Sequence, residues 1–151
     1  MQKRHGFTII EILIVIAVIA ILIGIALPRF KGMQDEGRIV QAKSELRTLQ
    51  TALESYYIHN NYTYPAAANL MANLTNTTPS IIGNASLADP FNLSGNYSYA
   101  VDAVTPKYYV MYSVGPNADG SAVINVNGTV TETNGKSCIY VTNGNPKDVQ
   151  P

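Results

Sequence analysis

Apolar residues follow one another almost without interruption near the start of this chain. From Phe7 to Leu27, counted inclusively, 21 residues contain a single charged side chain. A helix of that length reaches about 30 Å, which is the thickness of the hydrocarbon core of a bilayer. Because such a helix is apolar on every side, it needs lipid or protein around its whole circumference. The pattern therefore predicts a membrane-embedded helix.

Further along, the apolar residues occupy only one side of the predicted helix. They recur at steps of three and four, which places them on one stripe. The stripe consists of Ile39, Ala42, Leu46, Leu49, Leu53 and Tyr56. Pro28 removes a backbone donor and, with Gly24, predicts a kink in the helix. We expect one long helix from Phe7 to about Ile58, whose second half packs on a globular head.

The remainder of the chain has the pattern of a small β-sheet head. After an irregular stretch with one short helix near Ala66 to Leu74, five runs rich in Tyr, Val, Ile and Thr predict strands. These runs are residues 97–101, 108–114, 122–126, 129–133 and 137–142. Asn127-Gly128 predicts a two-residue type I′ hairpin. The tail from Asn143 to Pro151 is expected to be frayed, without regular secondary structure. The expected fold class is α+β, with the long helix packed on a small antiparallel sheet.

Composition excludes several classes of function. Ten Lys and Arg balance ten Asp and Glu, so the formal charge is zero and nucleic acid is not favoured as a main partner. No base, nucleophile and metal ligands form one constellation, so we expect no catalytic residues and no enzyme. Cys138 is the only cysteine, which rules out an intramolecular disulfide. A lone Cys in a strand is most often a small buried hydrophobe, although an intermolecular bridge stays open.

Glu11 is the one carboxylate inside the apolar segment. A charge near the centre of a bilayer costs about 2.5–3.5 kcal/mol on insertion scales, so a carboxylate there suggests a function. Two readings remain open. Glu11 either lies at the membrane edge with a hydrated head, or it pairs with a positive group such as Lys3, Arg4 or a newly created α-amine.

The residues around Glu11 form a recognisable motif, Lys3 to Glu11 with the sequence KRHGFTIIE. This motif resembles the class III leader of type IV pilins and type II secretion pseudopilins. The resemblance implies that a membrane-embedded peptidase cuts between Gly6 and Phe7 and N-methylates Phe7. It also implies that Glu11 pairs with the N-terminal amine of a neighbouring subunit and aids filament assembly.

Two other interpretations of the N-terminus explain less of it. A secretory signal has an apolar region of about 7–15 residues followed by small residues, whereas this run is longer and meets Pro28-Arg29-Phe30. A single-pass anchor with a basic cytoplasmic flank accounts for neither Gly6 nor Glu11.

Segments of the head extend the resemblance toward major pseudopilins. They are Tyr64-Pro65, Asp89-Pro90-Phe91 and the run from Ser113 to Gly120. In that branch the loop after the last segment binds a structural Ca²⁺, and Asp119 with Asn117 would supply ligands here. The acidic residues that usually follow are absent, and the same residues also make a good turn without metal. We therefore expect no cofactor, with Ca²⁺ at this loop as a possibility.

The resemblance implies a subunit of a helical filament, divided into a leader (residues 1–6), a transmembrane and filament-core half-helix (7–28), an amphipathic half-helix (29–60) and a head (61–151). Our sequence-based interpretation slightly favours a type IV pilus, serving adhesion, motility or DNA uptake. The alternatives are a periplasmic pseudopilus for type II secretion and a membrane-anchored binding domain that forms no filament. Expected partners are further copies of the chain, the prepilin peptidase and N-methyltransferase, the inner-membrane assembly platform and minor pilins. The precursor would cross the inner membrane once before it enters the filament.

Overall fold

The structure is a computed structural model that describes residues 7–75, 81–83, 88–92, 95–102, 106–133 and 138–146. The chain divides into two compact units, Met1–Gly37 and Arg38–Pro151. The first contains the apolar half of the long helix, and the second contains the amphipathic half together with the sheets.

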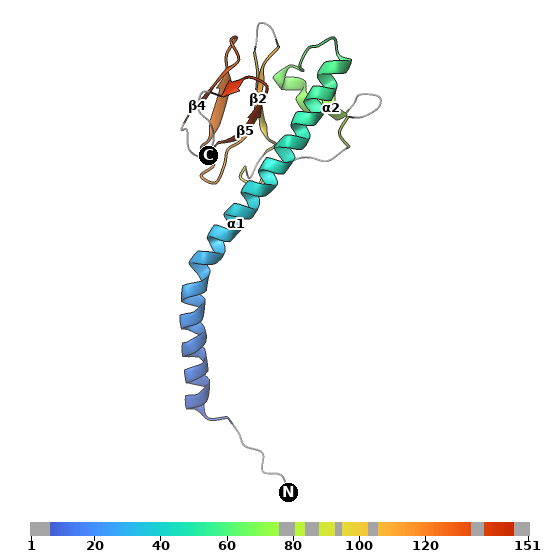
Figure 1. Cartoon of the computed structure of the whole chain (residues 1–151). Coiled ribbons are helices and arrows are strands. Elements are labelled where there is room, and N and C mark those ends of the chain that lie inside the picture. Colours follow the sequence, from blue (N-terminus) through green and yellow to red (C-terminus); the bar gives the residue numbers. More distant parts are fainter. Residues whose placement is uncertain are drawn as a thin grey trace. The chain divides into compact units, whose positions relative to one another are not determined.

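The long helix α1 comprises Ile9–His59 and is 51 residues long (Figure 1). The expected limits, Phe7 and about Ile58, differ from these by no more than two residues. Pro28 lies inside α1, and the helical assignment continues through it. Whether α1 kinks at Pro28 and Gly24 in an assembled form stays a prediction.

The end of α1 is closed by hydrogen bonds that satisfy its last carbonyls. The side-chain amide of Asn60 donates to the carbonyl of Tyr56 at 2.9 Å, and the backbone N–H of Tyr62 donates to that of Tyr57 at 3.0 Å. Asn61 and Tyr62 both have φ of 55°, in the left-handed region typical of helix ends. After this turn come the short helices η1, Ala67–Asn69, and α2, Leu70–Thr75, close to the helix expected near Ala66 to Leu74.

Two three-stranded sheets follow, where the sequence predicted one. The first has the order β1-β2-β5 and is antiparallel, with Met111 paired to Tyr99 and Val141. The second has the order β3-β4-β6, in which β4 and β6 are parallel. The strands are β1 Ser98–Val101, β2 Tyr109–Ser113, β3 Ser121–Ile124, β4 Thr129–Thr133, β5 Ile139–Thr142 and β6 Asn145–Pro146.

The parallel strand β6 is part of the tail that looked frayed in the sequence. Gly144 makes this pairing possible, because a Cβ on it would collide with the carbonyl oxygen of Gly128. The chain can therefore pass close to the β3–β4 turn only where no side chain is present. This close approach depends on two glycines 16 positions apart and cannot be seen in local periodicity.

The β3–β4 hairpin is present, but its turn is not the expected type I′. Of the two central residues only Gly128 has a positive φ, at 76°. Asn125 instead holds a longer loop, accepting through its side-chain oxygen the N–H groups of Asn127 at 3.1 Å and Thr129 at 2.9 Å. An Asx turn at Asn125 thus replaces the two-residue turn.

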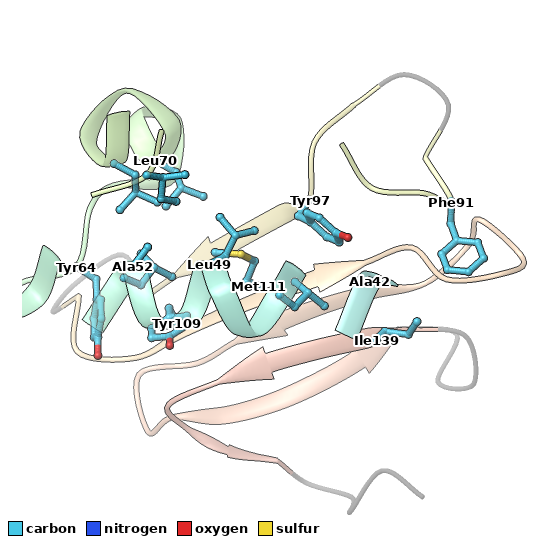
Figure 2. Packing of buried hydrophobic residues seen from close by; sticks show 14 residues of the cluster. Ala42, Leu49, Ala52, Tyr64, Leu70, Phe91, Tyr97, Tyr109, Met111 and Ile139 are labelled. Atoms are coloured by element: carbon cyan, nitrogen blue, oxygen red, sulfur yellow. The ribbon is translucent and has the colours of Figure 1, made fainter. Parts of the chain in front are cut away.

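The main core lies between α1 and the first sheet (Figure 2). Leu46, Leu49 and Leu53 are buried against Tyr109 and Met111 of β2. Ala42 of the predicted stripe is also buried, and Ile39 and Tyr56 pack at its margin, so the stripe is confirmed.

A second buried cluster lies on the other side of β2. It contains Val110, Ala122, Val130 and Cys138. Strand β2 is therefore covered on both faces, by α1 on one and by the second sheet on the other. This explains why Tyr109, Val110 and Met111 are all completely buried.

Candidate functional site

The N-terminus of α1 is fixed by a reciprocal pair of hydrogen bonds. The backbone N–H of Glu11 donates to Oγ1 of Thr8 at 3.3 Å, and the N–H of Thr8 donates to Oε2 of Glu11 at 3.5 Å. Because α1 begins at Ile9, Thr8 is the N-cap and Glu11 is the third helical residue, which is the arrangement of a capping box. The carboxylate of Glu11 also lies at the positive end of the helix dipole, which stabilises it there.

This arrangement gives Glu11 a role within its own chain. The carboxylate is exposed, so it keeps lone pairs for a second partner. Phe7 is 77% exposed, directly before the cap. Gly6 and the expected cleavage position lie outside the described residues, as do Lys3 and Arg4. The pairing of Glu11 with the amine of another subunit stays a prediction.

The first unit presents an apolar surface with nothing packed on it. Every residue from Phe7 to Gln34 is exposed, including Ile12, Ile16 and Ile23. By length and composition, α1 is the one helix among the described residues that could cross a membrane. An isolated subunit would expose this surface to water, so lipid or other helices must cover it.

In the second unit, two carboxylates attach α1 to the first sheet. Glu45 accepts a hydrogen bond of 2.7 Å from the hydroxyl of Tyr97, just before β1. Glu54 accepts bonds from the hydroxyls of Tyr64, at 3.0 Å and 3.1 Å to its two oxygens, and of Tyr109, at 3.1 Å. The two carboxylates lie nine residues apart, so they fix how α1 is placed on the sheet at two levels.

Aromatic rings surround the Glu54 contact. Tyr64 stacks on Tyr57 with ring centroids 4.5 Å apart, and it meets the edge of Tyr109 at 4.7 Å. Burial raises the pKa of Tyr64, and the carboxylate of Glu54 raises it further. The pKa of Tyr109 is raised in the same way. These phenols therefore stay neutral and act as donors to the carboxylate.

A third carboxylate, Asp89, joins two of the segments that resemble pseudopilins. It is 3% exposed and accepts a hydrogen bond of 2.7 Å from Oγ of Ser113. It also accepts the backbone N–H groups of Val114 and Phe91, each at 3.0 Å. Asp89-Pro90-Phe91 is thereby fixed to the end of β2, where the turn toward β3 begins.

The turn after β2 contains the residues suggested as calcium ligands. Asn117 and Asp119 are exposed, and each takes part in other interactions in the structure. Hydrogen bonds from Ala118 N–H to the carbonyl of Gly115 at 2.9 Å, and from Gly120 N–H to that of Val114 at 3.0 Å, account for the shape of the turn.

This donor set fits Ca²⁺ poorly. No group of three or more His, Cys, Asp or Glu side chains suited to a metal occurs among the described residues. Asp119 and Asn117 supply one carboxylate and one amide oxygen, whereas Ca²⁺ takes six to eight oxygen ligands. Calcium at this turn is therefore not part of the function proposed below.

Cys138 behaves as the sequence suggested for a buried thiol. It is 3% exposed and packs beside Val110, Ala122 and Val130. Burial raises its pKa to about 12, with further contributions from Glu132 and Asp89. The thiol is therefore protonated at neutral pH and a poor nucleophile.

Sequence reasoning missed two features of the site. The spacing Thr-x-x-Glu at Thr8 to Glu11 is the signature of a capping box, and it could have been found. The contacts of Asp89 and Glu54 with residues tens of positions away depend on tertiary packing, and no local pattern marks them.

Comparison with known proteins gives two family matches. Residues 1–27 match the prokaryotic N-terminal methylation motif, and residues 29–127 match type II secretion system protein G. The core protein G of Escherichia coli is 28% identical over 128 residues, which cover 78% of this chain and 86% of that protein.

Other relatives match over shorter segments. The core protein G of Pseudomonas aeruginosa is 32% identical over 68 residues, 44% of this chain and 47% of that protein. The type IV major pilin of Myxococcus xanthus is 42% identical over 55 residues, 36% of this chain and 25% of that protein. The chain thus spans less than half the length of these two relatives. No solved structure gives a significant match.

The N-terminal methylation motif covers residues 1–27, which include the capped start of the apolar helix. The helix continues into an amphipathic half packed on a small β-sheet head. Together these features define the class of pilins and pseudopilins. Within that class, the chain belongs to the family of type II secretion system protein G. Members of this class are structural subunits that assemble into filaments, and the apolar helix fits anchoring in the inner membrane before assembly.

Proposed function

We propose that the chain is the repeating subunit of a helical filament, built by packing the apolar halves of α1 against one another with the heads outside. The observation that carries this is the bare surface from Phe7 to Gln34, exposed on every side of the helix. Lipid covers it in the precursor, and neighbouring helices cover it in the filament. The contact between subunits is heterologous, so its rotation need not close and a fibre results.

Assembly begins with processing at the inner membrane. A prepilin peptidase and N-methyltransferase cleaves between Gly6 and Phe7 and methylates the new amine. Loss of Lys3 and Arg4 leaves eight Lys and Arg against ten Asp and Glu, a formal charge of −2 before the termini are counted. Glu11 then meets the amine on Phe7 of a neighbouring copy, and this ion pair sets the register of the helices. A buried charge needs such a partner, because leaving one uncompensated costs about 3–5 kcal/mol.

For the type of filament, we propose a periplasmic pseudopilus of type II secretion. The match to protein G includes most of the head, whereas the Myxococcus xanthus pilin matches over 55 residues. The bond between Asp89 and Ser113 also links two of the head segments that resemble pseudopilins. An inner-membrane platform and minor subunits would serve as assembly partners.

A surface pilus, which the sequence pattern slightly favoured, is the second candidate. The sequence Ser121-Ala122-Val123 after the turn, where pseudopilins usually carry acidic residues, supports it, as does the weakly charged composition rich in Asn and Thr. An anchored binding domain that forms no filament is the candidate from another class.

Electron microscopy of sheared cell-surface fractions separates these possibilities. Long fibres at native expression indicate a pilus. Short fibres, or fibres only after overexpression, indicate a pseudopilus. Absence of fibres at both levels contradicts a filament. Replacement of Gly6 by leucine should block processing, so a mature-size protein from that variant would contradict the assigned cleavage.

A further inference from the structure

The side of α1 that faces away from the first sheet carries two exposed cations, Lys43 and Arg47. They line an open groove of about 510 Å³. Its other lining residues are Val40, Ser44, Thr48 and Thr51. No hydrogen bond or ion pair is made by the side chain of Lys43 or Arg47 within the part of the chain that the structure describes.

The hydroxyl groups of the groove are partly used inside the helix. Thr48 donates to the carbonyl of Ser44 at 3.1 Å, and Thr51 donates to that of Arg47 at 3.0 Å. Val40 is 67% exposed beside them. The groove therefore offers positive charge and a small apolar contact, and it would suit an anionic side chain on an otherwise apolar surface.

Charges of alternating sign occur at steps of seven residues along α1. Arg29 is followed by Glu36 and then by Lys43. Seven residues are about two helical turns, or about 10 Å along the axis, which is beyond the range of pairs three or four residues apart. Accordingly, the side chains of Arg29 and Glu36 also make no hydrogen bond or ion pair among the described residues.

The same spacing brings opposite charges level when two parallel copies are displaced along their axes. All copies enter the membrane in one orientation, set by the basic residues of the leader, so their helices are parallel. If one copy is advanced by about 10 Å, its Glu36 lies level with Lys43 of the copy behind. Its Arg29 then lies level with Glu36 of that copy, so both pairs are complementary at one displacement.

We propose that the groove at Lys43 and Arg47 receives Glu36 of a second copy of this chain, advanced along the filament by about two to three helical turns. The larger displacement, about 16 Å, would bring Glu36 level with Arg47. This proposal rests on the proposed filament function and adds to it a specific contact outside the apolar segment. The contact selects the axial register of neighbouring subunits by charge, in addition to the selection made by the ion pair at Glu11.

The alternation of charge favours a second copy over a polyanion or an anionic lipid surface. A polyanion that followed this stripe would meet Glu36 between two cations, and like charges brought together are unfavourable. A parallel helix of the same sequence instead presents the opposite sign at each step.

Charge reversal in the full-length chain tests the contact. Glu36→Lys alone and Lys43→Glu alone should each lower fibre yield about tenfold, because each places like charges together at every subunit contact. The triple variant Arg29→Glu, Glu36→Lys and Lys43→Glu reverses both pairs together and should restore yield to nearly that of the wild type. Lys31→Glu is the matched control, since Lys31 is exposed and lies off this step; it should assemble normally.

Cysteine crosslinking measures the same contact without relying on yield. With Cys138→Ala as background, Glu36→Cys combined with either Lys43→Cys or Arg47→Cys should give a ladder of disulfide-linked oligomers on oxidation, whereas Lys31→Cys with Lys43→Cys should not. Equal levels of mature, membrane-inserted protein in all variants show that folding and processing are intact.

The outcomes distinguish the proposed contact from the proposed filament function on which it rests. Normal fibres from both single reversals, with no crosslinked ladder, would overturn the contact while leaving the filament function standing. Failure of the wild type to form fibres at all would overturn both.

Discussion

The hydroxyl of Ser113 donates a hydrogen bond of 2.7 Å to Oδ1 of Asp89, 24 residues earlier in the chain. Both side chains are buried, with 0% and 3% of their surface exposed. Oδ2 of the same carboxylate accepts the N–H of Val114, so the loop before β1 is attached to the end of β2. Ser113 Oγ in turn accepts the N–H of Gly115 at 3.1 Å, which continues the network into the turn toward β3.

Removal of this carboxylate should destabilise the head. Asp89→Ala leaves the hydroxyl of Ser113 and the N–H groups of Phe91 and Val114 without their acceptor. At 1–3 kcal/mol for each unsatisfied buried group, with partial relaxation, we expect the free energy of unfolding to fall by about 3 kcal/mol. Guanidinium unfolding of the full chain in detergent, followed by tyrosine fluorescence, measures it. Glu36→Ala, an exposed carboxylate, is the control and should change stability by less than about 0.5 kcal/mol. An equally small loss for Asp89→Ala would contradict the role of the network.

The contact between Glu54 and Tyr109 should appear as an energetic coupling. Tyr109→Phe removes a hydrogen bond to a charged acceptor and should cost about 1.5–3 kcal/mol. In a Glu54→Ala background the same change should cost less, with a coupling above about 0.5 kcal/mol, because the acceptor is already absent. Glu45 bonds Tyr97 instead, so Glu45→Ala combined with Tyr109→Phe should be additive. Additivity in both pairs would show that Glu54 does not hold the sheet through Tyr109.

Stability should fall in alkaline solution. Burial, followed by nearby carboxylates or phenols, raises the pKa of four tyrosines above the ordinary 10.0: Tyr64, Tyr97, Tyr99 and Tyr109. A group whose pKa is raised on folding contributes stability that is complete below its unfolded pKa and is lost as pH rises beyond it. Ionisation of these tyrosines should therefore leave the melting temperature unchanged from about pH 8 to 9 and lower it above pH 10. Tyr97→Phe should make the fall shallower, whereas a melting temperature that stays constant to pH 12 would contradict the burial of neutral phenols.

The sequence predicted the helical part of this fold well. Leu46, Leu49 and Leu53 recur at helical spacing, and that stripe is the surface that α1 buries. The α+β class and the pilin-like family are likewise confirmed. Helix periodicity is a local property, so it survives in the sequence regardless of which element covers the helix.

The arrangement of the strands was predicted less well. The pairing of β6 with β4 depends on Gly144 passing the carbonyl of Gly128, which is a contact between distant segments. The prediction of a type I′ turn at Asn127-Gly128 was wrong, because the side chain of Asn125 offers the backbone a competing hydrogen-bond acceptor. In both places, an interaction with a distant segment or with a side chain overrides the structure that the local sequence favours.

The sequence indicated Glu11 but not its local geometry, and the role of Glu11 in assembly stays a prediction. Glu11 stands out as a carboxylate in an apolar run, and the structure adds that it closes a capping box with Thr8. Two explanations for Glu11 therefore exist. One is the stability of its own helix, and the other is pairing with a neighbour's amine. They differ in whether the negative charge itself is needed.

Fibre yield from Glu11→Gln shows whether the negative charge of Glu11 is needed for assembly. Glutamine can keep the capping bond to the N–H of Thr8 but carries no charge. We predict that Glu11→Gln and Glu11→Ala are cleaved, methylated and inserted in the membrane as the wild type is, and that both lose most of their fibres. Thr8→Val, which removes the cap acceptor and keeps the charge, should still assemble. Full fibre yield from Glu11→Gln would contradict the account, because the cap alone would then explain why a carboxylate lies there.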